Sequence, residues 1–232
     1  MTTSRPNETA LIIGTGAGLS ASLARLFAKE DMRVAVAARR TDKLAALCGE
    51  TGARAYACDA SKPTEVESLF AAVTRDLAAP DIVVYNASYR SRGPLVELVP
   101  AEVEKALMVT CYGGFLVGQA AAKAMLARGS GSILFTGASA SVKGYVNSAP
   151  FAMGKFGLRG LAQSMARELA PKNIHVAHFV IDGGIEQAGA GSRGPDALLK
   201  PDAIARNYLD IHRQHRSAWT WEMELRPWVE NF

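Results

Sequence analysis

Apolar and polar positions alternate along the chain with two different periods. Six short runs are mostly apolar, which is typical of strands that are buried on both faces of a sheet. We expect these strands at residues 10–14, 33–39, 53–59, 81–86, 132–137 and 174–180. Near the C-terminus, Trp219, Trp221, Met223 and Leu225 recur at every second position, which predicts a seventh strand with one face inward.

The segments between these runs have the period of helices. Leu19, Leu23, Leu26 and Phe27 form one apolar stripe. Further helices are expected after Thr41, from Pro63 through Leu77, over residues 100–128 and from Pro150. Strands that alternate with helices predict βαβ units. We therefore expect an α/β fold with a doubly wound parallel sheet of about seven strands, helices on both faces, and a single domain over residues 1–232.

Composition and charge narrow the function classes. Hydrophobic residues make up 49% of the chain and charged residues 21%, as in ordinary soluble proteins. The net charge of +4 is dispersed, and its densest cluster is Arg39-Arg40, so we expect no nucleic-acid partner. The sequence lacks an apolar run of transmembrane length and a signal peptide, which predicts no membrane association. Cys48, Cys58 and Cys111 lack metal-ligand spacing, which favours a reducing cytoplasmic location and no metal site.

A glycine-rich stretch, GTGAGLS at residues 14–20, joins the first expected strand to the first expected helix. Glycines in such a turn let the backbone approach a pyrophosphate, and the helix N-terminus supplies free N–H donors. The alternative is an ordinary tight turn, which also requires glycine. The position of the stretch after the first strand of a βαβ series favours a dinucleotide site.

The end of the second expected strand bears on cofactor choice. NAD-binding proteins place an acidic residue there, whereas this chain has Ala38, Arg39 and Arg40. A guanidinium pairs with a 2′-phosphate in a bidentate manner, so the site favours NADP(H) over NAD(H). The alternative is a pair of arginines on a surface turn.

On these residues the chain resembles the short-chain dehydrogenase/reductase family, whose fold is the Rossmann fold, over nearly its whole length. The family motif Thr-Gly-x-x-x-Gly-x-Gly falls on residues 13–20, which keep its first two glycines but lack its Thr and its last Gly. The adenine-contacting Asp matches Asp59, and the Asn-Ala-Gly motif falls on residues 86–88, preceded by Asp81, whose family role is to steady the fourth strand. The cofactor-binding residues expected from the turn, the arginines and the resemblance together are Gly14, Gly16, Gly18, Leu19, Arg39, Arg40, Asp59, Asn86, Ala87, Lys155, Gly183 and Ile185.

The resemblance also indicates catalytic positions, and most of them are changed. The family Lys is present as Lys155, but the Tyr four residues before it is Phe151. The family Ser falls on Ala138, where the adjacent Ser139 could substitute, and the family Asn falls on Thr110. After the sixth strand, the family's Pro-Gly and Thr become Asp182-Gly183 and Gln187.

The remaining polar residues include other candidate proton donors and residues with structural roles. The tyrosine position of enoyl reductases is Ser148, a poor acid, whereas Tyr89 and Tyr145 are on loops that flank the expected active site but favour packing or surface roles. His175 and His178 are expected in the core, and His212 and His215 on a helix surface. The substrate loop is expected at residues 184–200, where the charge of Arg193 favours a solvated role.

Two functions remain open. The first is an NADP(H)-dependent oxidoreductase that acts on a small carbonyl or alcohol substrate with a nonstandard or weakened proton donor. The alternative is a catalytically impaired NADP(H)-binding protein, a sensor or an inactive subunit. Family members assemble through the fourth and fifth helices, so the resemblance also implies a homodimer or homotetramer, here through the segments at residues 120–126 and 157–170.

Overall fold

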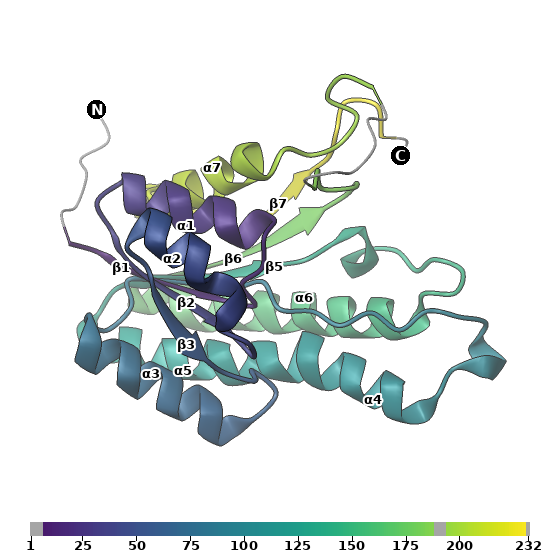
Figure 1. The fold of residues 1–232 in the computed structure, drawn as a ribbon, viewed down its shortest axis with the longest axis horizontal. Coiled ribbons are helices and arrows are strands. Elements are labelled where there is room, and N and C mark those ends of the chain that lie inside the picture. Colours follow the sequence, from purple (N-terminus) through teal and green to yellow (C-terminus); the bar gives the residue numbers. More distant parts are fainter. Residues whose placement is uncertain (1–6, 188–193, 231–232) are drawn as a thin grey trace.

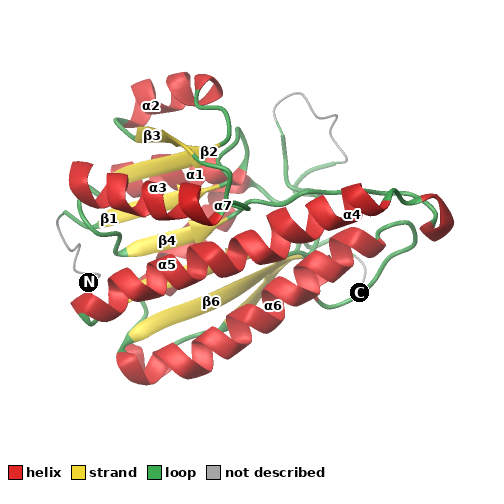
Figure 2. Ribbon diagram, turned by 90° about the horizontal axis from the view of Figure 1, so that it is seen from below, coloured by secondary structure: helices red, strands yellow, loops and turns green. Residues whose placement is uncertain are grey.

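A computed structural model describes residues 7–187 and 194–230, which form a seven-stranded parallel sheet between two layers of helices (Figures 1 and 2). The strand order is β3-β2-β1-β4-β5-β6-β7. The strands are β1 (Thr9–Ile13), β2 (Arg33–Ala38), β3 (Arg54–Ala57), β4 (Ile82–Tyr85), β5 (Gly131–Thr136), β6 (Ile174–Ile181) and β7 (Glu222–Leu225). The helices are α1 (Leu19–Lys29), α2 (Ala45–Thr51), α3 (Pro63–Asp76), α4 (Pro100–Leu107), α5 (Gly113–Arg128), α6 (Ala149–Leu169) and α7 (Pro201–His212). The predicted fold class is confirmed.

Each face of the sheet has its own apolar core. In β1, Ala10 and Ile12 pack against α1, α2 and α7, whereas Leu11 and Ile13 pack against α3, α5 and α6. This division follows from the strand geometry, because successive side chains point to opposite faces. Figure 1 shows α1, α2 and α7 on one side of the sheet and α3, α5 and α6 on the other.

The order of the strands places the candidate site. From β1 the chain moves outward through β2 to β3, then returns so that β4 pairs with the other side of β1. The carboxyl ends of β1 and β4 therefore diverge at a topological switch point, which is where open α/β sheets bind ligands. The residues after β1, β2 and β4 meet at this edge.

Five details differ from the sequence predictions. The third strand is shorter than expected and mostly exposed rather than buried on both faces, because it forms the edge of the sheet. The stretch at 100–128 is not one regular helix, because a π-helical segment, Met108–Tyr112, separates α4 from α5. The seventh strand begins only at Glu222, since Trp219 instead stacks on His175 with 4.6 Å between ring centres. Thr41 does not cap a helix with its side chain, and a 3₁₀ turn, Asp42–Leu44, precedes α2. The surface role predicted for His212 is wrong, because its ring hydrogen-bonds Ser132 and Glu8 and is only 7% exposed.

The burial of the remaining histidines agrees with the sequence predictions. His175 and His178 are buried within β6, as expected, and His215 is exposed. In the described part of the chain, the helices are too short or too polar to cross a membrane.

Candidate active site

The glycine turn after β1 requires glycine at its first position. Gly14 has a φ of +85°, and a Cβ there would lie 2.4 Å from the backbone nitrogen of Ala87. The backbone N–H groups of Gly14 and Thr15 both donate to the oxygen of Ala37, at 3.0 Å, which fixes the turn against β2. Around Gly16, by contrast, a Cβ would meet no atom within 4 Å. The turn is thus fixed to β2 on one side, and the space on the side of Gly16 is open.

Ser20, at the position of the last family glycine, links the turn to β4. Its hydroxyl donates to the backbone oxygen of Gly14 at 3.2 Å and accepts from the Asn86 amide nitrogen at 2.7 Å. Ser20 is buried, so these bonds are shielded from water. The substitution therefore provides a fixed connection between the two strand ends at the switch point.

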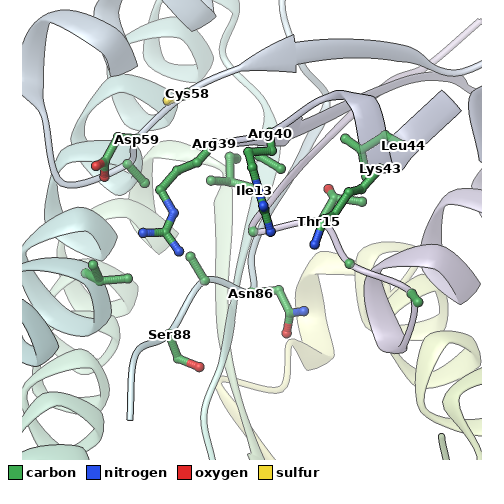
Figure 3. Close-up of a pocket in the computed structure, with 17 residues that line it drawn as sticks. Ile13, Thr15, Arg39, Arg40, Lys43, Leu44, Cys58, Asp59, Asn86 and Ser88 are labelled. Atoms are coloured by element: carbon green, nitrogen blue, oxygen red, sulfur yellow. The ribbon is translucent and has the colours of Figure 1, made fainter. Parts of the chain in front are cut away.

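A cavity of about 510 Å³ opens in front of this turn (Figure 3). It brings together seven of the predicted cofactor residues, namely Gly14, Gly16, Arg39, Arg40, Asp59, Asn86 and Ala87. Lys43 also lines the cavity and was missed by the sequence analysis. Its position three residues after Arg40, in the 3₁₀ turn Asp42–Leu44, could have indicated that it lines the same cavity. Figure 3 shows Arg39, Arg40 and Lys43 extending from the β2 side into the same cavity.

Asp59 lies at the outer wall of the cavity. Its carboxylate accepts hydrogen bonds from the Ser61 backbone nitrogen at 3.0 Å and from the Ser61 hydroxyl at 2.7 Å. Burial raises the pKa of this carboxyl, but the Ser61 bonds and the charge of Arg39 outweigh burial and lower the pKa overall. Asp59 is therefore an oriented anion at neutral pH.

Five predicted cofactor residues do not line this cavity, namely Gly18, Leu19, Lys155, Gly183 and Ile185. Leu19 directs its side chain into the core under α1, and Gly18 lines a second hollow of about 870 Å³ together with Gln187 and Lys200. Gly183 packs against the Pro227 ring, which a Cβ would approach to 2.6 Å, and Ile185 pairs with Leu199. Within the predicted substrate loop, Arg193 lies outside the described residues.

Lys155 is buried on α6, with 3% of its surface exposed. Its ammonium donates a hydrogen bond of 2.6 Å to the backbone oxygen of Thr136, at the carboxyl end of β5. Burial, and to a lesser extent the charge of Arg90, lower the pKa of Lys155 to about 7. The flanking glycines allow close packing, because a Cβ at Gly154 would lie 2.9 Å from Thr110.

An ion cluster fixes α6 to the edge of the sheet one turn beyond Lys155. Arg159 donates two hydrogen bonds of 2.7 Å to the carboxylate of Glu222 on β7. Glu222 also binds Nδ1 of the buried His178 at 3.0 Å. Burial lowers the pKa of His178 to about 4, which makes the ring neutral at pH 7. The bidentate pair thus sets the position of α6 and of Lys155.

The three changed catalytic positions have clear local partners. Phe151 is buried, with Arg90 4.1 Å and Lys155 5.8 Å from its ring centre. Thr110 accepts a hydrogen bond of 3.1 Å from the backbone nitrogen of Tyr89. The backbone nitrogen of Ala138 donates to the Ser141 hydroxyl at 3.1 Å, in the turn that contains the half-buried Ser139. Of the three, Phe151 and Ala138 belong to one small buried apolar cluster, and Thr110 is fully buried.

The alternative proton donors lie elsewhere. The Tyr89 hydroxyl donates to the Glu102 carboxylate and accepts from the Lys105 ammonium at 3.3 Å, so it is bound by α4. Tyr145 is 46% exposed, with the Lys143 ammonium 5.7 Å from its ring centre. Both arrangements agree with the packing and surface roles expected for these tyrosines.

Asp182, at the family's proline position, joins three segments. Its carboxylate is 3.1 Å from Arg226 and 3.6 Å from Lys143, and its side chain is 5% exposed. The end of β6, the turn after β5 and the residues after β7 are therefore held together beside the site. Over residues 7–187 and 194–230, the His, Cys, Asp and Glu side chains do not form a group of three suited to a metal ion.

Comparison with known proteins identifies the class to which this fold and site correspond. The sequence profile of the short chain dehydrogenase family matches residues 8–192. The chain belongs to this family. It is 29% identical over 196 residues to carbonyl reductase family member 4 of Xenopus tropicalis, which covers 84% of this chain and 83% of that protein. It is 30% identical over 216 residues to D-threitol dehydrogenase of Mycolicibacterium smegmatis, covering 85% and 83%.

Solved structures agree with this assignment. A short-chain dehydrogenase from Rhodopseudomonas palustris superimposes with a TM-score of 0.84 at 38% identity, covering 96% of this chain and 99% of that one. A metagenomic short-chain oxidoreductase in complex with NADP gives a TM-score of 0.86 at 27% identity, covering 98% and 100%. The family and these relatives support an oxidoreductase.

Proposed function

We propose that the protein is an NADP(H)-dependent oxidoreductase that transfers a hydride between the nicotinamide and a small carbonyl or alcohol substrate. The observation that carries this proposal is the set of three cations, Arg39, Arg40 and Lys43, around a cavity whose opposite wall is the glycine turn. Guanidinium and ammonium groups bind a phosphate through charge-assisted hydrogen bonds. A cofactor with a 2′-phosphate fits this cavity better than one with free ribose hydroxyls.

The cavity also fits the rest of a dinucleotide. The open side of the turn at Gly16, followed by the N-terminus of α1, suits a pyrophosphate. Asn86 and Ala87 form the adjoining wall at the end of β4. The complex of a structural relative with NADP supports the same assignment for this chain.

Lys155 is the group that we assign to the nicotinamide ribose. When bound, NADP(H) supplies or accepts the hydride. Lys155 would orient the ribose through hydrogen bonds, since its Nζ is already held at the end of β5 by Thr136. A lysine with a pKa near 7 also gives a cation that can lose its proton under neutral conditions. Phe151 offers no acidic proton, so proton transfer is weaker than with a tyrosine at that position.

A second candidate is a protein that binds NADP(H) with little turnover. It is favoured by the local partners of Phe151 and Thr110, because neither side chain is arranged as an acid. The cofactor side of the site is compatible with both functions. Turnover, rather than binding, distinguishes them.

Calorimetric titration with NADPH and NADH tests the cofactor assignment. We expect NADPH to bind more tightly than NADH, and Lys155→Ala to weaken NADPH binding by about 10- to 100-fold through loss of a charged hydrogen bond. Lys29→Ala, at the exposed C-terminal end of α1, is the matched control and is expected to bind like the wild type. Failure of both nucleotides to bind would remove the oxidoreductase proposal, and binding without hydride transfer to any carbonyl would favour the second candidate.

We further propose a homodimer or homotetramer that forms through α5 and α6. Phe115 on α5 and Phe156 on α6 are exposed by 41% and 44%, and Tyr112 stacks against Phe115 with 6.1 Å between ring centres. Exposed aromatic residues of this kind are enriched at interfaces. Sedimentation velocity at micromolar concentration tests the assembly, and a monomer there would contradict it.

A further inference from the structure

Arg90 has an unusual environment beside the catalytic positions. It lies on the loop after β4, is exposed, and places its guanidinium carbon 4.1 Å from the ring centre of Phe151. Among the described residues, its guanidinium has no carboxylate or hydrogen-bond partner, and the aromatic ring is its contact. Stacking uses the flat face of a guanidinium and leaves its N–H edges available. Within residues 7–187 and 194–230, these edges have no acceptor.

The backbone that carries Arg90 is held on both sides of Tyr89. The Tyr89 N–H donates to Thr110 at 3.1 Å, and the Tyr89 hydroxyl binds Glu102. The Lys105 ammonium lies 4.3 Å from the centre of the same tyrosine ring. The residue that precedes Arg90 is therefore anchored to the π-helical segment and to α4. Such preorganisation reduces the entropy that binding would otherwise cost.

A second cation faces the same ring. The Lys155 ammonium is 5.8 Å from the centre of Phe151, and the charge of Arg90 contributes to the lowered pKa of Lys155. Two like charges in one partly buried site repel each other, and an anion beside them would relieve this repulsion. Phe151 and Thr110, which lack the chemistry of the family residues, thus both contribute to the placement of Arg90.

We propose that the Arg90 guanidinium, stacked on Phe151, binds the carboxylate of an oxo-acid substrate. This inference rests on the proposed function, because hydride transfer requires the substrate carbonyl to lie near Lys155. A carboxylate matches the planar fork of arginine with two parallel hydrogen bonds. The binding of a charged group here also provides orientation that a neutral ketone would lack. Arg90 is accordingly a specificity-determining residue, and it keeps its proton throughout.

The test compares a charged oxo acid with its neutral ester. Acetoacetate, methyl acetoacetate and inorganic phosphate are titrated separately into the full-length protein, with and without saturating NADPH, and binding is followed by ligand-observed NMR. We expect acetoacetate to bind about tenfold more tightly than the ester. Arg90→Ala should weaken acetoacetate about 10- to 100-fold and leave the ester unchanged, since a charged hydrogen bond is worth that much.

Three further variants make the result specific. Arg90→Lys should retain part of the preference, because an ammonium binds as a point charge without the fork. Phe151→Leu should weaken acetoacetate about threefold through loss of the stacked ring. Arg216→Ala, an exposed arginine in the turn before β7, is the matched control and should bind acetoacetate like the wild type.

Several outcomes would overturn the proposal. These are equal binding of acid and ester, an Arg90→Ala variant that retains the preference, an equal loss in Arg216→Ala, and phosphate binding more tightly than acetoacetate at Arg90. NADPH affinity is measured in every variant, so that a loss of acetoacetate binding is separated from a loss of the cofactor. If the wild type binds no NADPH but shows Arg90-dependent acetoacetate binding, the cofactor assignment fails while the carboxylate site stands.

Discussion

The Nζ atom of Lys155 lies 2.6 Å from the backbone oxygen of Thr136, which is its one hydrogen-bond acceptor among the residues that the structure describes, and the ammonium is buried. One hydrogen bond does not replace the hydration that a charged lysine loses on burial. This imbalance explains why burial lowers the pKa of Lys155 from its ordinary 10.5 to about 7.

The first prediction concerns stability and pH. Between pH 7 and about 10.5 the unfolded chain keeps a proton on Lys155 that the folded chain has released. The free energy of unfolding should therefore rise with pH across this window, by at most about 1.4 kcal/mol per pH unit from this group. Urea unfolding of the wild type and of Lys155→Met, at several pH values, measures the difference. A pH dependence that is the same in both proteins would contradict the prediction.

The second prediction separates two glycines of the turn after β1. Gly14→Ala should destabilise the fold by more than about 1 kcal/mol, because the φ of +85° and the backbone of Ala87 both exclude a side chain. Gly16→Ala should change stability by less than about 0.5 kcal/mol, since the space around it is open. Gly16→Ala should nevertheless weaken NADPH, because the methyl group occupies the cofactor side. Thermal unfolding and calorimetry together give both results, and equal destabilisation by the two variants would refute this account of the turn.

The third prediction concerns the cations of the cavity. Arg40→Ala and Lys43→Ala should each raise the Kd for NADPH about tenfold, whereas the Kd for NADH should change less than about twofold. The selectivity arises because only NADPH has the 2′-phosphate. Arg54→Ala, exposed on β3 outside the cavity lining, is the control. Equal losses for both nucleotides would show that the cations contact the pyrophosphate or serve the fold.

The fourth prediction restores the family's acid. Phe151→Tyr combined with Ala138→Ser should raise the rate of carbonyl reduction by about 10²- to 10⁴-fold, which is the usual contribution of a positioned acid. Phe151→Leu combined with Ala138→Ser is the control without a hydroxyl at residue 151. The rate is followed by NADPH absorbance. An unchanged rate in the tyrosine variant would mean that the site is not a weakened form of the family arrangement.

The sequence was a good guide wherever a local pattern determines the structure. The strands predicted at residues 10–14 and 174–180 are observed at Thr9–Ile13 and Ile174–Ile181. Their side chains are buried on both faces of the sheet, so each strand is a continuous apolar run that can be recognised from the sequence alone. The glycine turn was likewise recognisable, because Gly14 needs a conformation that other residues avoid. These features depend on neighbours in the chain.

Features that depend on distant contacts were not predictable in the same way. Arg90 gains its role only through Phe151, which is 61 positions along the chain and reaches it through α6. His212 was expected on the surface because nothing near it indicates the pairing with Ser132, 80 residues earlier. The shortened seventh strand likewise reflects the stacking of Trp219 on His175, which the alternating pattern does not encode.

The π-helical segment Met108–Tyr112 places one extra residue between α4 and α5. A turn closed by i→i+5 hydrogen bonds contains one residue more than an α-helical turn, so removal of one residue here would let α4 and α5 join as a regular α-helix. Thr110, which lies in the segment and accepts a hydrogen bond from the Tyr89 backbone, would then lose its present position. A single-residue deletion should therefore disturb the loop at Tyr89 more than the packing of the two helices.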